Sequence, residues 1–218
     1  MSPPVFSSEH PLSLDLMQFP LSAGLQGGGR LISLRWSAGL AWVVGSDGSG
    51  KTRFLQALSG ETRLPKGVVT LRTPSGTTVT PDQEAWKNQV FWCDPDRDAL
   101  DGLTGHAYLA HHAQRHQGWR SEVASAHLDA FQLSGHLDKP LYALSMGMRR
   151  KLRLTAAFAS GAPLTLLDEP FAALDFRSIQ HVQEILRECR ELTTRLVVVA
   201  VSDPEFASDE CILLNLDS

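Results

Sequence analysis

Short and nearly unbroken apolar runs recur along the chain, and each has the length of a strand rather than of a helix. They cover residues 40–44, 164–167 and 196–201, and such runs are typical of strands buried on both faces. Between the last two runs, apolar positions at helical spacing predict an amphipathic helix over 178–192: Ile179, Val182, Ile185, Leu186, Cys189 and Leu192. Strands that alternate with helices favour a mainly parallel α/β core.

Several other segments in the first half of the chain predict an N-terminal antiparallel β region. Glycines 27–29 mark one turn, and Thr73-Pro74-Ser75-Gly76 marks a hairpin. The strands expected on this basis are 12–19, 30–36, 67–72 and 77–80, and residues 88–93 are a further strand candidate. The Pro- and Ser-rich residues 1–11 are expected to form a flexible tail.

The middle of the chain changes character. Residues 103 to about 137 are rich in Ala, His, Gln and Leu, which is typical of helix. This stretch and the residues up to 160 interrupt the alternation of strands and helices. We therefore expect a helical subdomain over about 96–160, inserted into a single domain of residues 12–218.

Composition narrows the class of protein. A hydrophobic fraction of 43% and a net charge of −4 describe an ordinary globular protein without a broad basic surface for nucleic acid. Cys93, Cys189 and Cys211 have no CxxC spacing, which favours reduced thiols in a cytoplasmic protein. The sequence has no apolar run of about 20 residues and no signal-peptide pattern. Any membrane role is therefore expected to come through a partner.

The segment Gly-Ser-Asp-Gly-Ser-Gly-Lys-Thr at residues 45–52 is a complete phosphate-binding loop. It follows one of the apolar runs and precedes a predicted helix, 51–59, that ends at Gly60. The glycines let backbone N–H groups converge on phosphate oxygens, Lys51 adds positive charge, and the Thr52 hydroxyl suits Mg²⁺. The sequence therefore predicts that a nucleoside triphosphate and Mg²⁺ are bound by Gly45, Ser46, Asp47, Gly48, Ser49, Gly50, Lys51, Thr52 and Arg53.

Two acids follow the apolar run 164–167. At the end of that strand, Asp168 is expected to share the Mg²⁺ shell with Thr52, while Glu169 is expected to orient or deprotonate an attacking water. Upstream, Ser145 and Gly147 begin another predicted helix, 23 residues before Asp168. A Ser cap and a Gly at that helix start would provide a second anion-binding end.

With these motifs the chain resembles the ATP-binding cassette (ABC) family of transporter ATPases over roughly residues 12–216. The resemblance implies that 45–52 is the Walker A loop, 144–148 the signature, 164–169 the Walker B strand and 172–175 the D-loop. It also implies two cassettes that face each other head to tail. Each ATP would be held between the Walker A loop of one cassette and Ser145 and Gly147 of the other, and closure would drive an integral membrane permease.

The resemblance extends to one further contact and to a subfamily. Phe19 lies where the family places an aromatic ring that stacks on adenine, although core packing also accounts for it. The segment Leu-Leu-Asp-Glu-Pro-Phe-Ala-Ala-Leu-Asp looks most like the ATPase subunit of the haem exporter used in cytochrome c maturation. Met-Arg-Arg at 148–150 is also similar to small exporter cassettes of the polysaccharide and drug type.

Three departures from the family pattern predict slow hydrolysis, or a second cassette that supplies the missing groups. Ser202 stands where the family has a switch histidine that contacts the γ-phosphate, so it is the third catalytic candidate beside Glu169 and Lys51. Asp94-Pro95 replaces a Mg²⁺-sensing glutamine. There Asp94 or Asp96 either binds the ion through water or is a solvated loop acid. The signature carries Met146 and Met148 in place of Gly and Gln.

The leading interpretation is a cytoplasmic ATPase subunit, peripheral on the inner face of the membrane, paired with a second cassette as a homodimer or heterodimer. The alternatives are a soluble cassette ATPase and a nucleotide-gated regulatory module with weak hydrolysis. Nucleic acid is not an expected partner, because the basic run Arg149, Arg150, Lys151 and Arg153 is expected to form a solvated helix face. His112 and His116 have a metal-chelating spacing but no matching third ligand, and are expected to be exposed or partner-facing.

Overall fold

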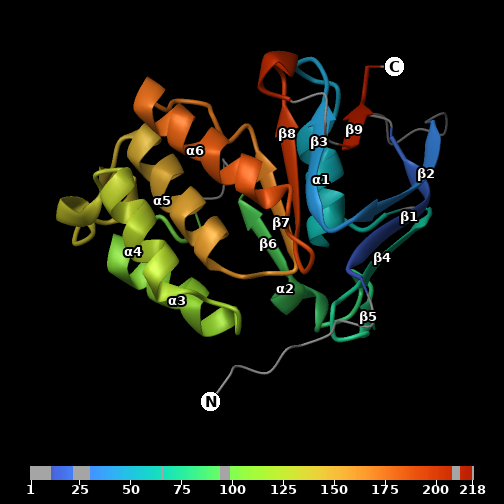
Figure 1. Ribbon diagram of the computed structural model, residues 1–218, viewed down its shortest axis with the longest axis horizontal. Helices are drawn as coiled ribbons and strands as arrows, with labels where there is room; N and C mark the ends of the chain where they lie inside the picture. Colours follow the sequence, from blue (N-terminus) through green and yellow to red (C-terminus); the bar gives the residue numbers. More distant parts are fainter. Residues whose placement is uncertain (1–10, 22–29, 65, 94–98, 208–211, 218) are drawn as a thin grey trace.

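The computed structural model describes residues 11–21, 30–64, 66–93, 99–207 and 212–217 (Figure 1). Its centre is a five-stranded sheet in which every neighbouring pair is parallel, in the order β6-β7-β8-β3-β9. The strands are β3 (Gly39–Val44), β6 (Val90–Cys93), β7 (Leu164–Asp168), β8 (Leu196–Val201) and β9 (Ile212–Asn215). All residues of β3, β7 and β8 are buried, which confirms the parallel core that the unbroken apolar runs predict.

A second, antiparallel sheet of order β2-β1-β4-β5 forms the N-terminal part of the fold. Its strands are β1 (Ser13–Pro20), β2 (Leu31–Ser37), β4 (Val68–Arg72) and β5 (Thr78–Val79). This sheet confirms the predicted antiparallel region and its hairpin. The predicted turn at 27–29 and most of the predicted tail, residues 1–10, lie outside the described residues.

Helix α1 (Lys51–Ser59) lies between the two sheets (Figure 1). Its residues Phe54, Leu55 and Leu58 share a buried cluster with apolar side chains of both sheets, including Trp36 of β2. The helix begins and ends where the sequence predicts. It stops at Gly60 because that residue adopts φ 83°, a left-handed conformation in which glycine has no steric penalty.

The remaining long helices lie on the opposite side of the parallel sheet from α1 (Figure 1). The fold thus has three layers: these helices, the parallel sheet, and the antiparallel sheet together with α1. The remaining long helices are α3 (Gly105–Arg115), α4 (Ser121–Ala130), α5 (Met146–Ala159) and α6 (Phe176–Cys189), with a short α2 (Trp86–Gln89) and 3₁₀ turns η1 (Ser134–His136), η2 (Leu141–Ala143) and η3 (Pro204–Phe206). Val182, Leu186 and Cys189 of α6 are buried, as the helical spacing predicts. The helical subdomain limits of about 96–160 stay a prediction, since residues 94–98 lie outside the described residues.

A half-buried arginine, Arg195, joins the end of α5 to the central sheet. The Arg195 guanidinium donates hydrogen bonds to the carbonyl oxygens of Ala157 (2.5 Å) and Phe158 (3.0 Å) and to Thr165 Oγ1 of β7 (2.6 Å). Burial lowers the pKa of Arg195 to about 10, which leaves the group charged at neutral pH. Arg195 therefore fixes the C-terminal end of α5 onto β7.

The basic run on α5 is not a solvated face, so that prediction is wrong. Arg150 and Arg153 are only 9% and 8% exposed. Arg149 and Arg153 both donate to the carboxylate of Asp101, at 3.2 and 3.1 Å. Lys151 pairs with Asp175 at 2.5 Å. The acids come from loops distant in sequence, so charge density along α5 alone does not reveal that its cations are neutralised within the fold.

The expectation of exposed histidines is wrong for His116, which is 3% exposed. Its ring stacks on that of His112 and packs against Phe91 of β6. Among the residues described, no group of three or more His, Cys, Asp or Glu side chains is arranged to hold a metal ion. Within the same ranges, no helix has both the length and the apolar character needed to cross a bilayer.

Candidate nucleotide-binding site

The loop between β3 and α1 has the shape of an anion cradle. Gly48 and Gly50 adopt φ values of 83° and 100°, and no described residue other than their chain neighbours comes within 4 Å of where their Cβ atoms would be. Gly45 differs, because a Cβ there would meet Ser49 Oγ at 2.4 Å. Gly45 therefore lets the loop fold closely on itself, while Gly48 and Gly50 keep its outer surface open for a ligand.

The Lys51 side chain is hydrogen-bonded to the backbone of the loop itself. Its ammonium donates to the carbonyl oxygens of Gly45 at 2.8 Å and Ser46 at 3.1 Å, and the residue is only 6% exposed. The same ammonium lies 3.5 Å from Glu169 Oε1. A positive charge is thus held at the start of α1, where the helix dipole also favours negative ligands.

Asp168 and Thr52 meet directly. Thr52 Oγ1 donates to Asp168 Oδ2 at 2.6 Å, and Asp168 is 1% exposed at the end of β7. Burial raises the pKa of Asp168, while the hydrogen bond from Thr52 and the charges of Lys51 and Arg150 oppose that rise. Its other oxygen, Oδ1, has no hydrogen-bond partner among the described residues. A buried, unpaired carboxylate oxygen beside a hydroxyl is a donor set that fits Mg²⁺.

Glu169 is held in place by its backbone and by its side chain. It has φ 44°, an uncommon conformation for a residue other than glycine, and its N–H donates to Ala200 O of β8 at 2.9 Å. Ser202 Oγ lies 2.5 Å from Glu169 Oε1 and 2.7 Å from Asp47 Oδ1 of the phosphate loop. Ser202 therefore connects the loop to the acid that follows β7.

These contacts bring most of the predicted site into one cluster at the carboxyl ends of three adjacent parallel strands, β3, β7 and β8. Ligands of open α/β sheets bind at such an edge. The residues joined there by hydrogen bonds or ion pairs are Gly45, Ser46, Asp47, Lys51, Thr52, Asp168, Glu169 and Ser202. Arg53 is exposed in the first turn of α1, and its contact with nucleotide stays a prediction.

Ser145 and Gly147 form a separate, exposed helix end. Ser145 caps α5 by accepting a hydrogen bond from the Met148 N–H at 3.2 Å, as predicted. A Cβ on Gly147 would lie 2.5 Å from Ala173 O, so glycine allows α5 to approach the turn after Glu169. Met146 between them is 64% exposed. The surface that would face a second cassette is therefore open in the single chain.

The proposed adenine contact of Phe19 is contradicted. Phe19 is 1% exposed and packs edge-on against Phe54 of α1, with ring centroids 5.0 Å apart. A ring enclosed in this way presents no face to a nucleotide. Phe19 is therefore a core residue that packs against α1. Asp94 and Asp96, the candidates for replacing the sensing glutamine, lie outside the described residues.

Two residues at the site are not among those that sequence reasoning selects. Arg150 of α5 donates to the carbonyl oxygen of Asp168 at 3.0 Å, behind the acid pair. The carboxylate of Asp217 accepts hydrogen bonds from Ser46 N at 2.7 Å and Ser46 Oγ at 2.9 Å. Arg150 has no distinguishing signal within the run Arg149-Arg150-Lys151. Asp217 has no local signal, because its role depends on β9 pairing with β3.

The three-layer fold, the phosphate loop and the acid pair after the neighbouring strand define a P-loop nucleoside-triphosphatase core. The chain belongs to the ABC transporter family, whose family model matches residues 32–172. The chain is 32% identical to human ATP-binding cassette sub-family A member 13. The aligned region covers 68% of this chain but only 3% of that much longer protein.

Shorter relatives align over most of their length. The chain is 30% identical to the cytochrome c biogenesis ATP-binding export protein CcmA of Pseudomonas fluorescens, over 71% of this chain and 72% of that protein. Among solved structures, the ATP-binding subunit of an ABC transporter superposes with a TM-score of 0.76, over 93% of this chain and 86% of that one, at 19% identity. At that identity the structural likeness supports the fold alone.

Proposed function

We propose that this chain is the ATP-hydrolysing subunit of an ABC transporter and couples ATP turnover to an integral membrane permease. The observation that carries the proposal is the cluster in which Thr52 contacts Asp168 and Lys51 contacts Glu169, beside a phosphate loop that is open at Gly48 and Gly50. Such a cluster contains the parts that phosphoryl transfer requires: a phosphate cradle, a metal-binding acid and an acid that orients water.

Each residue has a defined task in this proposal. The backbone N–H groups of the loop and the Lys51 ammonium bind the β- and γ-phosphates. Thr52 and Asp168 would hold Mg²⁺, which would neutralise phosphate charge when bound. Glu169 accepts the hydrogen bond of the attacking water. Glu169 already pairs with the Lys51 ammonium, and Asp168 and Asp47 add further negative charge to the site, so we expect a divalent cation to be needed before a triphosphate can approach.

Ser202 makes hydrolysis slow in this proposal. A serine hydroxyl is shorter than the imidazole that the family resemblance implies, and it cannot carry positive charge. Here the hydroxyl contacts Glu169 and Asp47. This contact occupies the acid that should orient water, and it also favours the second candidate function, a nucleotide-gated regulatory module that binds ATP and turns over little of it.

The second cassette completes the site. Ser145 and Gly147 lie at an exposed helix end whose N–H groups favour an anion, and we assign this end to the γ-phosphate bound by the partner cassette. The partner is either a second copy or a related cassette. The CcmA relatives are export proteins of cytochrome c biogenesis, so we assign export of haem or another small molecule to this chain. It would then lie on the inner face of the membrane, held by its permease.

Trapping the closed dimer tests this function. Glu169→Gln should bind ATP with Mg²⁺ but hydrolyse it too slowly to reopen, so light scattering after size exclusion should detect a dimer only when both are present. Glu188→Gln, an exposed acid on α6, is the matched control and should stay monomeric. Adding Ser145→Arg to Glu169→Gln should prevent the dimer without reducing ATP binding.

Three results would contradict the proposal. ATP binding that survives Lys51→Ala unchanged would remove the nucleotide site. A Glu169→Gln dimer that forms equally without ATP would remove the closure mechanism. If the native protein stays wholly in the soluble fraction when the membranes of its own cells are sedimented, the alternative of a soluble cassette ATPase replaces the permease partner.

A further inference from the structure

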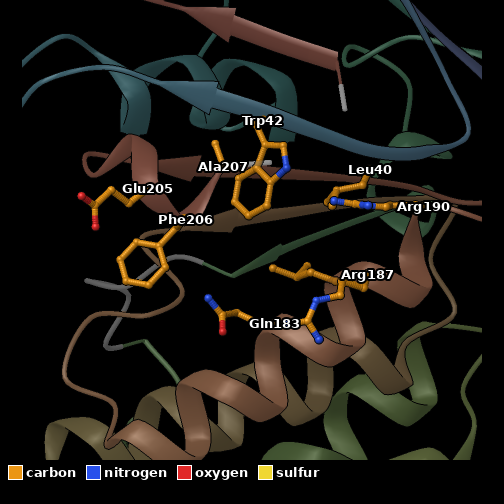
Figure 2. Close-up of a pocket in the computed structure, with 9 residues that line it drawn as sticks. Leu40, Trp42, Gln183, Arg187, Arg190, Glu205, Phe206 and Ala207 are labelled. Carbon is orange, nitrogen blue, oxygen red and sulfur yellow. The ribbon is translucent and has the colours of Figure 1, made fainter. Parts of the chain in front are cut away.

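A cavity of about 200 Å³ lies between the parallel sheet and α6 (Figure 2), and none of the phosphate-loop residues 45–52 lines it. Its apolar lining comes from Leu40 and Trp42 of β3, from Leu186 of α6, and from Phe206 and Ala207 after β8. Sites for drug-sized ligands usually measure about 300–1,000 Å³. This cavity therefore suits a smaller molecule with a flat apolar body, which could lie between the Trp42 and Phe206 rings.

Trp42 gives the cavity an unused hydrogen-bond donor. The residue is 3% exposed, yet its Nε1 has no hydrogen-bond partner among the residues that the structure describes. Figure 2 shows Trp42 extending from β3 toward α6, with its indole nitrogen on the side of Leu40 and Arg190. A buried N–H without an acceptor costs free energy, and a ligand oxygen at this position would remove that cost.

The polar part of the lining is mainly cationic. Arg187 and Arg190 come from the last turn of α6 and its C-terminal cap, and Gln183 lies one turn before Arg187. Glu205 of η3 also lines the cavity and is exposed, and its carboxylate points away from the two arginines in Figure 2. Among the described residues of the lining, two guanidinium groups and one carboxylate supply the charged groups, so this wall offers cationic hydrogen-bond donors to an anion. An arginine also offers a planar fork of donors that matches a carboxylate.

We propose that this cavity binds a small organic anion, specifically a carboxylate carried on a flat apolar ring. The carboxylate would accept hydrogen bonds from Arg190 and from Trp42 Nε1, and the ring would pack against Leu40, Leu186 and Phe206. The proposal depends on this lining alone and not on the ATPase function of the chain. It assigns to α6 a ligand site separate from the nucleotide site.

The cavity is nonetheless connected to the catalytic loops. The Phe206 ring stacks on that of Phe171, with centroids 4.3 Å apart and an interplanar angle of 17°. Phe171 follows Glu169 by two residues, and Phe206 follows Ser202 by four. A ligand against Phe206 would therefore contact the segment that follows Ser202 directly, and the loop that carries Glu169 only through the Phe206–Phe171 stack.

Direct binding of 4-fluorobenzoate to the full, nucleotide-free chain tests the proposal. Fluorine NMR line broadening should show saturable binding in the millimolar range or tighter. 4-Fluorobenzamide has the same ring without the charge and should bind at least about 10-fold more weakly, as expected when a charged hydrogen bond is lost. Binding of both probes with equal affinity would overturn the assignment of an anion site.

Two variants test the residues that are proposed to bind the carboxylate. Arg190→Gln removes the cation, and Trp42→Phe keeps an aromatic ring while removing the N–H donor. Each should weaken 4-fluorobenzoate binding by about 10-fold or more. Arg177→Gln, on the exposed first turn of α6 and outside the cavity, is the control and should leave the affinity unchanged.

Circular dichroism should confirm that all three variants fold. If Trp42→Phe does not fold, Arg190→Gln still tests the proposal, because it leaves the buried apolar lining unchanged. Unchanged affinity in folded Arg190→Gln would overturn the proposal. Absence of saturable binding by the wild-type chain at tens of millimolar 4-fluorobenzoate would overturn it as well.

Discussion

Ser202 Oγ lies 2.5 Å from Glu169 Oε1 and also contacts Asp47 Oδ1 at 2.7 Å. A serine hydroxyl carries one proton, so it can donate to only one of these two carboxylates at a time. The carboxylate that does not receive the proton then faces a lone pair of the hydroxyl at short range. Glu169 is thus oriented by a neighbour that neither neutralises its charge nor reaches beyond it toward a phosphate.

Replacing Ser202 tests whether this residue limits turnover. Ser202→His should raise ATP hydrolysis by at least about 10-fold, because a general acid–base side chain typically contributes about 10²–10⁴-fold and an imidazole can carry charge. Phosphate release under saturating ATP and Mg²⁺ measures the rate. Ser202→Asn is the matched control, since its amide is larger than serine but cannot be charged. Equal rates for Ser202→His and wild type would exclude Ser202 as the cause of slow hydrolysis.

Thr52 tests the metal assignment. Thr52→Ala removes the hydroxyl that contacts Asp168, and should reduce the gain in ATP affinity that Mg²⁺ provides by about 10-fold or more. Titration of a fluorescent ATP analogue with and without Mg²⁺ measures that gain. Thr52→Ser retains the hydroxyl and should behave like the wild type. If Thr52→Ala keeps the full Mg²⁺ dependence, Thr52 is not a ligand of the ion.

Gly147 tests the packing of the signature helix. In Gly147→Ala the new Cβ would lie 2.5 Å from Ala173 O, so α5 or the turn after Glu169 must move. We expect a loss of about 1–3 kcal/mol in the free energy of unfolding, measured by urea denaturation. Gly135→Ala is the control, because within the described ranges no atom lies within 4 Å of its added Cβ. A Gly147→Ala variant as stable as Gly135→Ala would refute the close approach.

His116 predicts how stability depends on pH. Burial lowers the pKa of His116 to about 4, with the charge of Arg115 adding to the effect. The unfolded chain takes up this proton near pH 6.5 and the folded chain only near pH 4, so stability falls as the pH decreases through that window. We expect His116 to account for roughly 1–2 kcal/mol of the loss between pH 7.5 and pH 5.

Urea denaturation at the two pH values measures this loss. His116→Phe preserves a ring against Phe91 and removes the titrating group, so its stability should change less with pH. His106→Gln, at an exposed position on α3, should show the wild-type pH dependence. An unchanged pH dependence in His116→Phe would show that His116 is not the group responsible.

The features that the sequence predicts correctly depend on local or periodic signals. The strand over 196–201 is recognisable because burial on both faces requires an unbroken apolar run. Helix α1 is recognisable because Gly60 marks its end. Thr52 and Asp168 could be paired in advance because a phosphate loop and an acid after a neighbouring parallel strand must meet at the same sheet edge.

The features that the sequence does not predict depend on contacts between distant segments. Phe19 is buried because α1 brings Phe54 against it, and no pattern around Phe19 indicates that. The cations of α5 find Asp101 and Asp175 on other loops, so they form internal pairs instead of a basic surface. Strand β9 is not predicted, because it is only four residues long and its sole pairing within the described part of the chain, with the distant β3, is formed by the fold.

The Arg195 contacts also determine how the signature end can move. Helix α5 has 14 residues, so its two ends are about 20 Å apart. Arg195 holds its C-terminal end to β7 through several hydrogen bonds, while Ser145 stands at the opposite, exposed end. The first turns of α5 are also fixed, because Arg150 donates to the carbonyl oxygen of Asp168 at the end of β7. Helix α5 is therefore tied to β7 near both of its ends, so we expect a displacement of β7 to move the Ser145 end where two cassettes would meet.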